Sequence, residues 1–260
     1  MPIQVIDRAL KLLRIVARRG PSTLTEISRE AGLPLPTTAR ILNSLAENGV
    51  MGRLDGRRYQ LGARLLPLTT SLEPFRKTLA SVHPVLEELG RLTGEDCGFA
   101  VLQGKEAVVV DWCYGAGGPR VIEPFSREIP LYCAFGKVLI AFQPASWRQR
   151  FLRSAELKRL AVGTVLNKEE LAAEIVRIRQ TGLHVSYAEN VDGAGSLSVP
   201  VFDGLSRLHG ALFITGPVET VEAGRFLQHK ELLFGAARRL HLELSRALPD
   251  RPRRRSAPAA

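Results

Sequence analysis

Residues 24–45 read LTEISREAGLPLPTTARILNSL, and this stretch decides the fold of the N-terminal part of the chain. Its first part predicts a short helix over 25–31 that stops at Gly32, because glycine readily adopts the left-handed conformation that ends many helices. Pro36 predicts the first turn of a second helix, where its missing N–H costs no hydrogen bond. Two short helices joined by a tight, glycine-containing turn are typical of a helix-turn-helix.

The second helix carries an apolar stripe and a polar surface. Ala39, Leu42 and Leu45 recur at helical spacing and are expected to face the core, and Asn48-Gly49 ends the helix. Such a helix enters the major groove with its N-terminus first, so that polar residues near that end reach bases and phosphates. The residues expected to contact DNA from these two helices are Thr25, Pro36, Thr37, Thr38, Arg40, Asn43 and Ser44.

A β-hairpin is expected directly after the second helix. Asp55-Gly56 separates the two β-prone runs 50–54 and 57–61, which is a strong local hairpin signal. Arg57 and Arg58 would lie at its tip and contact phosphate or the minor groove. The order of helix, turn, helix and hairpin predicts a winged helix-turn-helix that binds double-stranded operator DNA; a module for protein interactions is the alternative.

The positive charge is concentrated at the two ends of the chain. A first amphipathic helix is expected over 4–18, with Ile6, Ala9, Leu10, Leu13 and Val16 at helical spacing. Residues 1–78 hold 13 Lys and Arg against 6 Asp and Glu, whereas residues 79–249 hold 19 of each. A basic segment joined to a neutral one is the pattern of a polyanion-binding module attached to another domain, although a basic surface kept for solubility is also possible.

The C-terminal half alternates strand and helix patterns. Strands are expected at 97–103, 107–113, 120–126, 183–189, 196–203 and 208–215, with helices at 133–143, 146–154, 168–180 and 219–247. A helical connector over 64–92, interrupted by Pro67 and Pro74, leads into this half. The pattern predicts an α+β fold with a central antiparallel sheet.

No catalytic or metal-binding motif is found. The five histidines form no ligand spacing, and no nucleophile elbow, Walker or dinucleotide sequence occurs. Cys97, Cys113 and Cys133 suit a reducing cytoplasm and are expected to be buried small hydrophobes rather than a metal or redox site. No cofactor, metal or membrane contact is therefore expected, and 115–119 is expected to be a flexible loop.

Several segments resemble the IclR family of transcriptional regulators. In the N-terminal half these are VIDRALKLL (5–13), LTEI (24–27), GLP (32–34) and YQLG (59–62). In the C-terminal half they are IPLYCAFGKVLIAF (129–142), VPVFD (199–203) and GALFITGP (210–217). The resemblance extends from about residue 3 to 248 and implies a GAF-like or profilin-like effector-binding domain whose ligand lies in a cup on one face of the sheet.

The resemblance also implies which residues would contact the effector. Family members that bind small carboxylic acids tend to have an acidic residue where Ser186 aligns and a cysteine where Ser196 aligns. The aromatic Phe213, and Phe135 in the loop, therefore favour a less polar effector, with aromatic molecules among the candidates; the alternative is that these rings simply fill the core. The residues carried over from the family pattern are Ala134, Phe135, Ser186, Ser196, Phe213 and Thr215.

These observations predict a cytoplasmic, one-component regulator, a repressor or an activator, that acts as a dimer or a dimer of dimers. A winged helix-turn-helix would occupy residues 1–63, a helical linker 64–80, an effector-binding domain 81–248 and a basic disordered tail 249–260. The effector would be an organic acid or an aromatic catabolite, and a nearby metabolic operon would be controlled. An enzyme with a regulatory DNA-binding domain and a protein-interaction scaffold are the rival interpretations.

Overall fold

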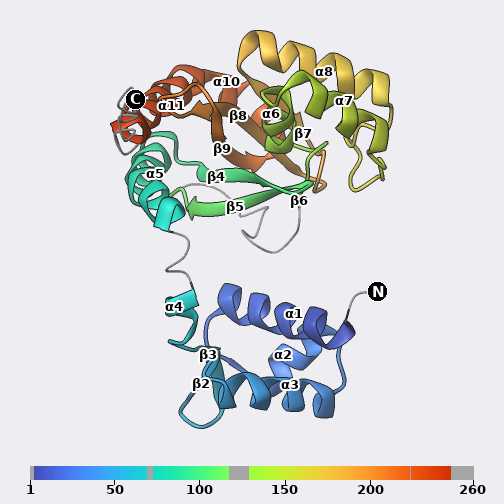
Figure 1. The fold of residues 1–260 in the computed structure, drawn as a ribbon, viewed down its shortest axis with the longest axis vertical. Helices are drawn as coiled ribbons and strands as arrows, with labels where there is room; N and C mark the ends of the chain where they lie inside the picture. The colour runs from blue at the N-terminus through green and yellow to red at the C-terminus, as the bar shows by residue number, and fades with distance from the viewer. Residues whose placement is uncertain (1–2, 69–72, 117–128, 223, 247–260) are drawn as a thin grey trace, which may run out of the picture. The chain divides into compact units, whose positions relative to one another are not determined.

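The computed structural model describes residues 3–68, 73–116, 129–222 and 224–246 (Figure 1). The chain divides into two compact units, the first built mainly from residues up to Arg76 and the second from Lys77 onward. Within the described ranges, none of the helices has both the length and the apolar character needed to span a bilayer. The predicted strand 120–126 and tail 249–260 lie outside the described residues.

The first unit is a three-helix bundle with a small antiparallel sheet, which confirms the predicted winged helix-turn-helix. Its sheet has the order β1-β3-β2. Leu12, Ile27 and Leu42, one from each helix, are fully buried against Met51 and Tyr59 of the hairpin. The elements are α1 (Gln4–Arg19), β1 (Ser22–Thr23), α2 (Leu24–Ala31), α3 (Leu35–Glu47), β2 (Met51–Leu54), β3 (Arg58–Leu61) and the short α4 (Leu65–Leu68).

Thr23 begins α2 and also belongs to the sheet. Its hydroxyl accepts a hydrogen bond from the Glu26 N–H, and its own N–H donates to the Glu26 carboxylate at 2.7 Å, which completes a capping box. The hydrogen bonds that the Thr23 N–H and hydroxyl donate to the Glu26 carboxylate lower the pKa of Glu26. The two-residue strand β1 pairs with β3 through Ser22–Tyr59 and Thr23–Arg58. The sequence pattern missed β1 because two residues are too few to show alternation.

The buried faces of α1 and α3 differ from those predicted. In α1, Leu12, Ile15 and Val16 form the buried stripe, while Ile6 and Leu10 are exposed. In α3, Thr38 is fully buried, so the prediction that it lies on the surface is wrong. The Thr38 hydroxyl donates to the Pro34 carbonyl oxygen at 3.2 Å, which satisfies the buried polar atom within the helix.

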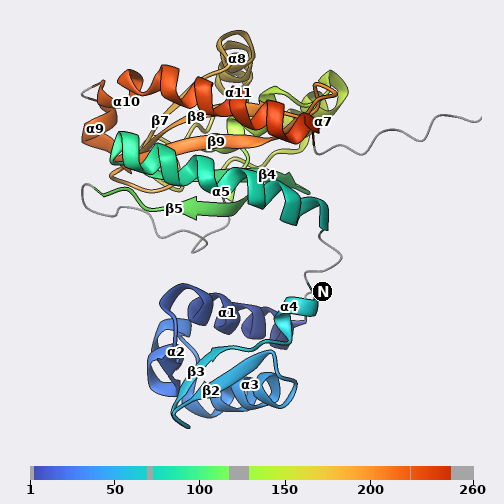
Figure 2. The ribbon, with the colours of Figure 1, turned by 90° about the vertical axis from the view of Figure 1, so that its left-hand side faces the viewer.

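The second unit is a six-stranded antiparallel sheet with helices on both faces (Figure 2). The strand order is β6-β5-β4-β9-β8-β7. The strands are β4 (Asp96–Gln103), β5 (Glu106–Cys113), β6 (Ile129–Pro130), β7 (His184–Tyr187), β8 (Ala194–Phe202) and β9 (Leu208–Pro217). The helices are α5 (Glu73–Thr93), α6 (Phe135–Ala141), α7 (Ala145–Ser154), α8 (Lys168–Thr181), α9 (Val218–Glu222), α10 (Arg225–Gln228) and α11 (Lys230–Arg246).

Two separate cores cover the two faces of this sheet. On one face, Leu86 of α5 and Leu240 of α11 pack against Leu197 and Ile214 of the sheet. On the other face, α6 and α8 pack over the side that carries Phe213. Because side chains alternate along a strand, neighbouring positions such as 213 and 214 serve different cores.

The structure confirms most predicted elements of this unit and corrects others. The predicted terminal helix 219–247 is three helices, separated where Gly224 adopts φ 73° and at His229. The two-residue strand β6 was not predicted. The helical connector consists of α4, which ends at Leu68, and α5, which begins at Glu73 with Pro74 as its second residue, and Pro84 lies inside α5.

The Thr23→Ala variant should lower the free energy of unfolding of the first unit by about 1 kcal/mol, because it removes the helix cap. Urea denaturation of the full-length chain measures this change in the transition of the first unit. Thr25→Ala is the matched control, since Thr25 lies on the same helix with an exposed side chain, and its effect should stay within about 0.5 kcal/mol. Equal effects of the two variants would contradict the role given to the cap.

Candidate functional site

The outer face of α3 carries most of the residues expected to contact DNA. Pro36, Arg40, Asn43 and Ser44 are all exposed, and their spacing places them on one side of the helix. Thr37 is partly exposed at the N-terminal end of the same helix. Thr25, at the start of α2, is also exposed. The buried Thr38 contributes no hydroxyl to this face.

The two arginines of the hairpin tip differ, because Arg57 is exposed whereas Arg58 is paired with Asp55. Residues 55–57 form the turn, with Asp55 and Gly56 both at positive φ. Arg58 forms an ion pair with Asp55 at 2.5 Å. Arg57 is exposed, and within the described part of the chain it has no ion-pair partner. Arg57 is therefore the tip residue whose charge is most available to a phosphate.

A bracket of three side chains joins the hairpin to α3. The Asn43 carboxamide oxygen accepts hydrogen bonds from the Arg53 guanidinium at 2.7 Å and from the Tyr59 hydroxyl at 3.1 Å. The Arg53 guanidinium also lies 5.3 Å from the centre of the Tyr59 ring. Asn43 thus positions the hairpin against the helix. Sequence reasoning missed Arg53 and Tyr59 because no local spacing relates them to Asn43.

The predicted effector-contacting residues of the sheet lie next to one another on the face covered by α6 and α8. Ser186 of β7 is opposite Ser196 of β8, and Ser196 is opposite Thr215 of β9. In the adjacent row, His184 is opposite Ser198 and Ser198 is opposite Phe213. We call this set of two rows, with Phe135 above it, the cup.

Aromatic rings fill the centre of the cup. The Phe135 ring, from the start of α6, stacks on Phe213 with centroids 4.1 Å apart and planes at 14°. The Trp112 ring meets Phe213 edge-on at 5.7 Å. Gly98 lies beneath Phe213, and an added Cβ there would be 2.4 Å from its ring. Both phenylalanines are almost fully buried.

Besides His184 Nε2, which lies 3.2 Å from the Glu189 carboxylate, three buried polar atoms of this face have no hydrogen-bond partner within the described residues. They are the Trp112 Nε1 and the hydroxyl oxygens of Ser196 and Ser198. A buried polar group without a partner costs about 1–3 kcal/mol. Their concentration around Phe213 marks the cup as a place where a small molecule with a polar group gains hydrogen bonds. The Thr215 hydroxyl, in contrast, donates to the Gly195 carbonyl oxygen at 2.8 Å.

A buried ion cluster lies beside the cup. The ammonium of Lys137 is fully buried, 2.5 Å from Glu174 of α8 and 2.9 Å from Glu189. Glu189 also accepts a hydrogen bond from the Ala134 N–H at 2.7 Å and lies 3.2 Å from His184 Nε2. Burial raises the pKa of Glu189, but the nearby His184 and Lys137 outweigh it and lower that pKa overall. Sequence reasoning missed this cluster because its members are far apart along the chain.

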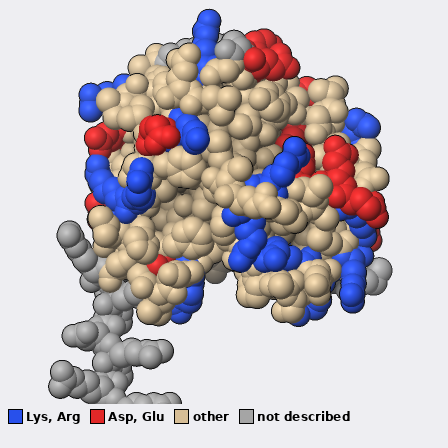
Figure 3. Space-filling model, turned by 90° about the horizontal axis from the view of Figure 1, so that it is seen from above, with Lys and Arg blue, Asp and Glu red and all other residues tan. Residues whose placement is uncertain are grey.

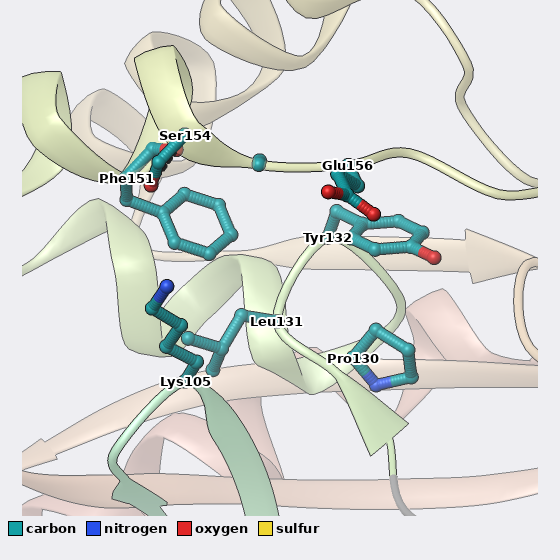
Figure 4. A pocket seen from close by; sticks show the side chains of 8 residues that line it. Lys105, Pro130, Leu131, Tyr132, Phe151, Ser154 and Glu156 are labelled. Atoms are coloured by element: carbon teal, nitrogen blue, oxygen red, sulfur yellow. Dashed lines mark hydrogen bonds between the residues drawn. The ribbon is translucent and has the colours of Figure 1, made fainter. Parts of the chain in front are cut away.

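A surface pocket of about 260 Å³ lies outside the cup (Figure 4). Lys105 is drawn below Phe151, and Glu156 beside Tyr132. The Tyr132 hydroxyl is already hydrogen-bonded to the backbone of Lys158. The buried polar atoms of the cup, in contrast, lack hydrogen-bond partners within the described residues, and for that reason we favour the cup as the candidate ligand site. The pocket is lined by Lys105, Pro130, Leu131, Tyr132, Phe151, Ser154, Ala155 and Glu156.

Two of the three cysteines, Cys97 and Cys133, are buried as expected, whereas Cys113 is only half-buried. Cys97 and Cys113 are cross-strand partners, and Cys133 lies near the cup with its thiol 3.5 Å from the Glu189 carbonyl oxygen. All three are free thiols. Burial raises the pKa of Cys97 and of Cys133 to about 12, and thiols that stay protonated are poor metal ligands and nucleophiles.

The surface of the second unit carries both signs of charge. On the face drawn in Figure 3, basic and acidic side chains lie interspersed among neutral ones. This agrees with the equal numbers of basic and acidic residues over 79–249. The excess of basic residues lies instead in the segment that forms the first unit.

Models of the same protein family match both halves of the chain. The family model of the IclR helix-turn-helix domain matches residues 5–53, and that of the bacterial transcriptional regulator IclR C-terminal matches residues 76–242. The probable transcriptional regulator SauR of Cupriavidus necator is 34% identical over 215 residues, covering 81% of this chain and 85% of that protein. The transcriptional repressor IclR of Escherichia coli is 26% identical over 245 residues, covering 92% and 89%.

Solved structures share the fold. The crystal structure of the Thermotoga maritima IclR has a TM-score of 0.71 at 24% identity, covering 93% of this chain and 99% of that one. An IclR homologue from Microbacterium hydrocarbonoxydans, complexed with 4-hydroxybenzoate, has a TM-score of 0.71 at 21% identity, covering 94% and 100%. At these identities the likeness establishes the fold alone.

The Lys137→Met variant should lower the free energy of unfolding of the second unit by about 3–5 kcal/mol, because it leaves the Glu189 carboxylate buried without its cation. Urea denaturation of the full-length chain measures the loss. Lys158→Met is the control, since the Lys158 side chain is 75% exposed, and its effect should be below about 1 kcal/mol. Similar effects of both variants would show that the buried ion cluster does not stabilise this unit.

Proposed function

The chain belongs to the IclR family of bacterial transcriptional regulators, and on that premise we propose that it is a cytoplasmic one-component switch whose operator binding is set by a small metabolite. As a member of that family it is a DNA-binding transcriptional regulator and not an enzyme. The metabolite is an organic acid or an aromatic catabolite, and the controlled genes form a nearby metabolic operon. The observation that carries this proposal is a cup whose buried Ser196 and Ser198 hydroxyls lack a partner within the described residues, in a chain that also exposes Arg40 on α3 and Arg57 at the hairpin tip.

Each candidate DNA-contacting residue has a distinct role in the proposal. Arg40 and Ser44 of α3 contact base edges, with Pro36 and Thr37 at the helix start. Arg57 and Thr25 contact phosphates, and Arg58 joins them when DNA competes with Asp55 for its guanidinium. Asn43 acts mainly by holding the hairpin through Arg53 and Tyr59, and Thr38 acts by packing within α3.

A second copy of the chain is needed to read a two-fold symmetric operator. The N-terminal part of α1 exposes apolar side chains on one side, with Ile3 61%, Ile6 50% and Leu10 46% exposed. These positions are three and four residues apart and form an apolar stripe. We assign this stripe to the contact between two DNA-binding units, in a dimer or a dimer of dimers.

The effector acts by preferring one arrangement of the two DNA-binding units over another. A preference of about 1–3 kcal/mol changes DNA affinity about 5- to 150-fold. The proposed contacts come from Ser186, Ser196 and Thr215 on the sheet, Phe213 at its centre, and Ala134 and Phe135 at the start of α6. The ligand of the family member from Microbacterium, 4-hydroxybenzoate, is both aromatic and a carboxylic acid and so supports each of the two classes considered.

Arginine variants test the DNA-binding proposal. Arg57→Ala should weaken binding to a selected genomic fragment and to an unrelated duplex equally, and should reduce the slope of log affinity against log salt by about 1, because it removes one phosphate contact. Arg40→Ala should weaken binding to the selected fragment by a further ~1–3 kcal/mol relative to the unrelated duplex. Fluorescence anisotropy at several salt concentrations measures both.

Arg150→Ala is the control for these variants, because Arg150 is exposed on α7 of the other unit. Its affinities should match those of the parent. The DNA-binding role of α3 and the hairpin would be refuted by folded Arg40→Ala and Arg57→Ala variants that bind the selected fragment as tightly as Arg150→Ala.

The Leu10→Glu variant tests the α1 contact. It should reduce affinity for a fragment with two half-sites by at least about tenfold, because the advantage of binding two half-sites together is lost. Affinity for a single half-site should stay within about twofold. Val176→Glu is the control, with Val176 54% exposed on α8. Unchanged binding of Leu10→Glu to the two-half-site fragment would exclude this surface as the dimer contact.

A further inference from the structure

We infer that the cup takes an uncharged, planar aromatic molecule with one hydrogen-bonding group, and that the side chain of Phe135 occupies the place of that molecule's ring. The inference rests on the proposed function, since it names the ligand class of the same site. Its starting point is the stacked pair in which Phe135 lies on Phe213 with centroids 4.1 Å apart and planes at 14°. That geometry is the one a bound aromatic ring adopts on a phenylalanine floor.

The floor of the cup is shaped for a flat ring. Phe213 lies directly over Gly98, where even a methyl group would be 2.4 Å from the ring. The edge of Trp112 closes one side, 5.7 Å from Phe213 between centroids. The floor and one wall are therefore aromatic and fixed by the register of β4, β5 and β9. Phe135 is the only one of the three rings that comes from outside these strands.

The backbone on both sides of Phe135 is held in place. The Ala134 N–H on one side is held by Glu189 at 2.7 Å. Gly136 on the other side lies so close to Leu131 that an added Cβ would be 2.7 Å from its backbone. The main chain is thus fixed at both neighbours of Phe135, so the exchange of its ring for that of a ligand is a change in the side-chain torsions.

The polar atoms around the ring select an uncharged group. The hydroxyls of Ser196 and Ser198 and the indole N–H of Trp112 are neutral, buried and without a partner within the described residues. They suit a hydroxyl or carbonyl oxygen, which both accepts hydrogen bonds and carries no charge. Phe135 is a hydrocarbon and cannot satisfy them, so a ligand that adds one such oxygen to the same ring gains hydrogen bonds that Phe135 does not make.

Among the described residues, the cationic side chains at the cup already have carboxylate partners. Lys137, the buried cation beside it, already contacts Glu174 at 2.5 Å and Glu189 at 2.9 Å. His184, opposite Ser198, lies 3.2 Å from the same Glu189 carboxylate. A ligand carboxylate would therefore be desolvated next to an existing negative charge, which disfavours it.

Three small probes test the inference by calorimetry on the full-length chain. Benzyl alcohol is the Phe135 side chain with one added hydroxyl. Cyclohexylmethanol keeps the hydroxyl but lacks the flat ring, and benzoate keeps the ring but adds a charge. The Phe135→Ala variant should bind benzyl alcohol at least about tenfold more tightly than the parent, because the competing side chain is gone. It should bind cyclohexylmethanol and benzoate at least about tenfold more weakly than benzyl alcohol.

The matched control is Phe142→Ala, which removes a ring that packs on Phe202 at the far end of α6, and its affinity for benzyl alcohol should equal that of the parent. If Phe135→Ala does not unfold cooperatively, Phe135→Leu replaces it, because leucine is smaller than phenylalanine and lacks its flat ring but keeps an apolar side chain in the core. The same order of affinities is then expected. Quenching of Trp112 fluorescence in a Trp147→Phe background reports binding independently.

Two results would overturn the inference: benzyl alcohol affinity of the Phe135 variant no higher than that of the parent, or benzoate bound as tightly as benzyl alcohol. The first would show that Phe135 is a wall or core residue and does not compete with the ligand. Neither result bears on the proposal that the chain binds DNA, because the arginine variants test that proposal separately. Loss of DNA binding with the ring preference intact would instead remove the proposed function and leave the ligand class in place.

Discussion

One buried ammonium group organises the sensing half of this regulator. Lys137 of α6 is fully buried and contacts Glu174 of α8 and Glu189 after β7, so that three separate segments meet at a single charge. Glu189 in turn fixes the Ala134 N–H, and Ala134 precedes the ring that covers the cup. A buried charge is tolerated only where its partners are held in place. The position of Phe135 is thus a consequence of where this charge is neutralised.

The DNA-binding half depends on hydrogen bonds that each join two elements. Thr23 caps α2 and also pairs with Arg58 of β3. This one residue therefore links the hairpin to the helix-turn-helix at one end. Asn43, Arg53 and Tyr59 tie it from the other. Helix and hairpin can therefore approach DNA as one rigid body, with Arg40 and Arg57 on separate elements of fixed relative position.

Much of this fold follows from local sequence signals, and the exceptions have physical causes. Gly32, Pro36 and Asp55-Gly56 act through their own backbone preferences, so the helix-turn-helix and hairpin were predictable. Thr38 was misplaced because a threonine whose hydroxyl bonds within its own helix can be buried like an apolar residue. The neighbouring positions of Ser186, Ser196 and Thr215 followed only from family resemblance. The ion cluster and the Asn43 bracket depend on contacts between distant segments, which no local pattern contains.

The alternation of side chains along β8 and β9 has an evolutionary consequence. Leu197 and Ile214 point into the core beneath α5 and α11, whereas Ser196, Ser198 and Phe213 point into the cup. Under the proposed function, substitutions on the second set would change chemical preference without disturbing the packing of the first. A duplicated gene could then drift toward a new effector by exchanging a few side chains on one surface, and an engineered biosensor could be diversified at those same codons.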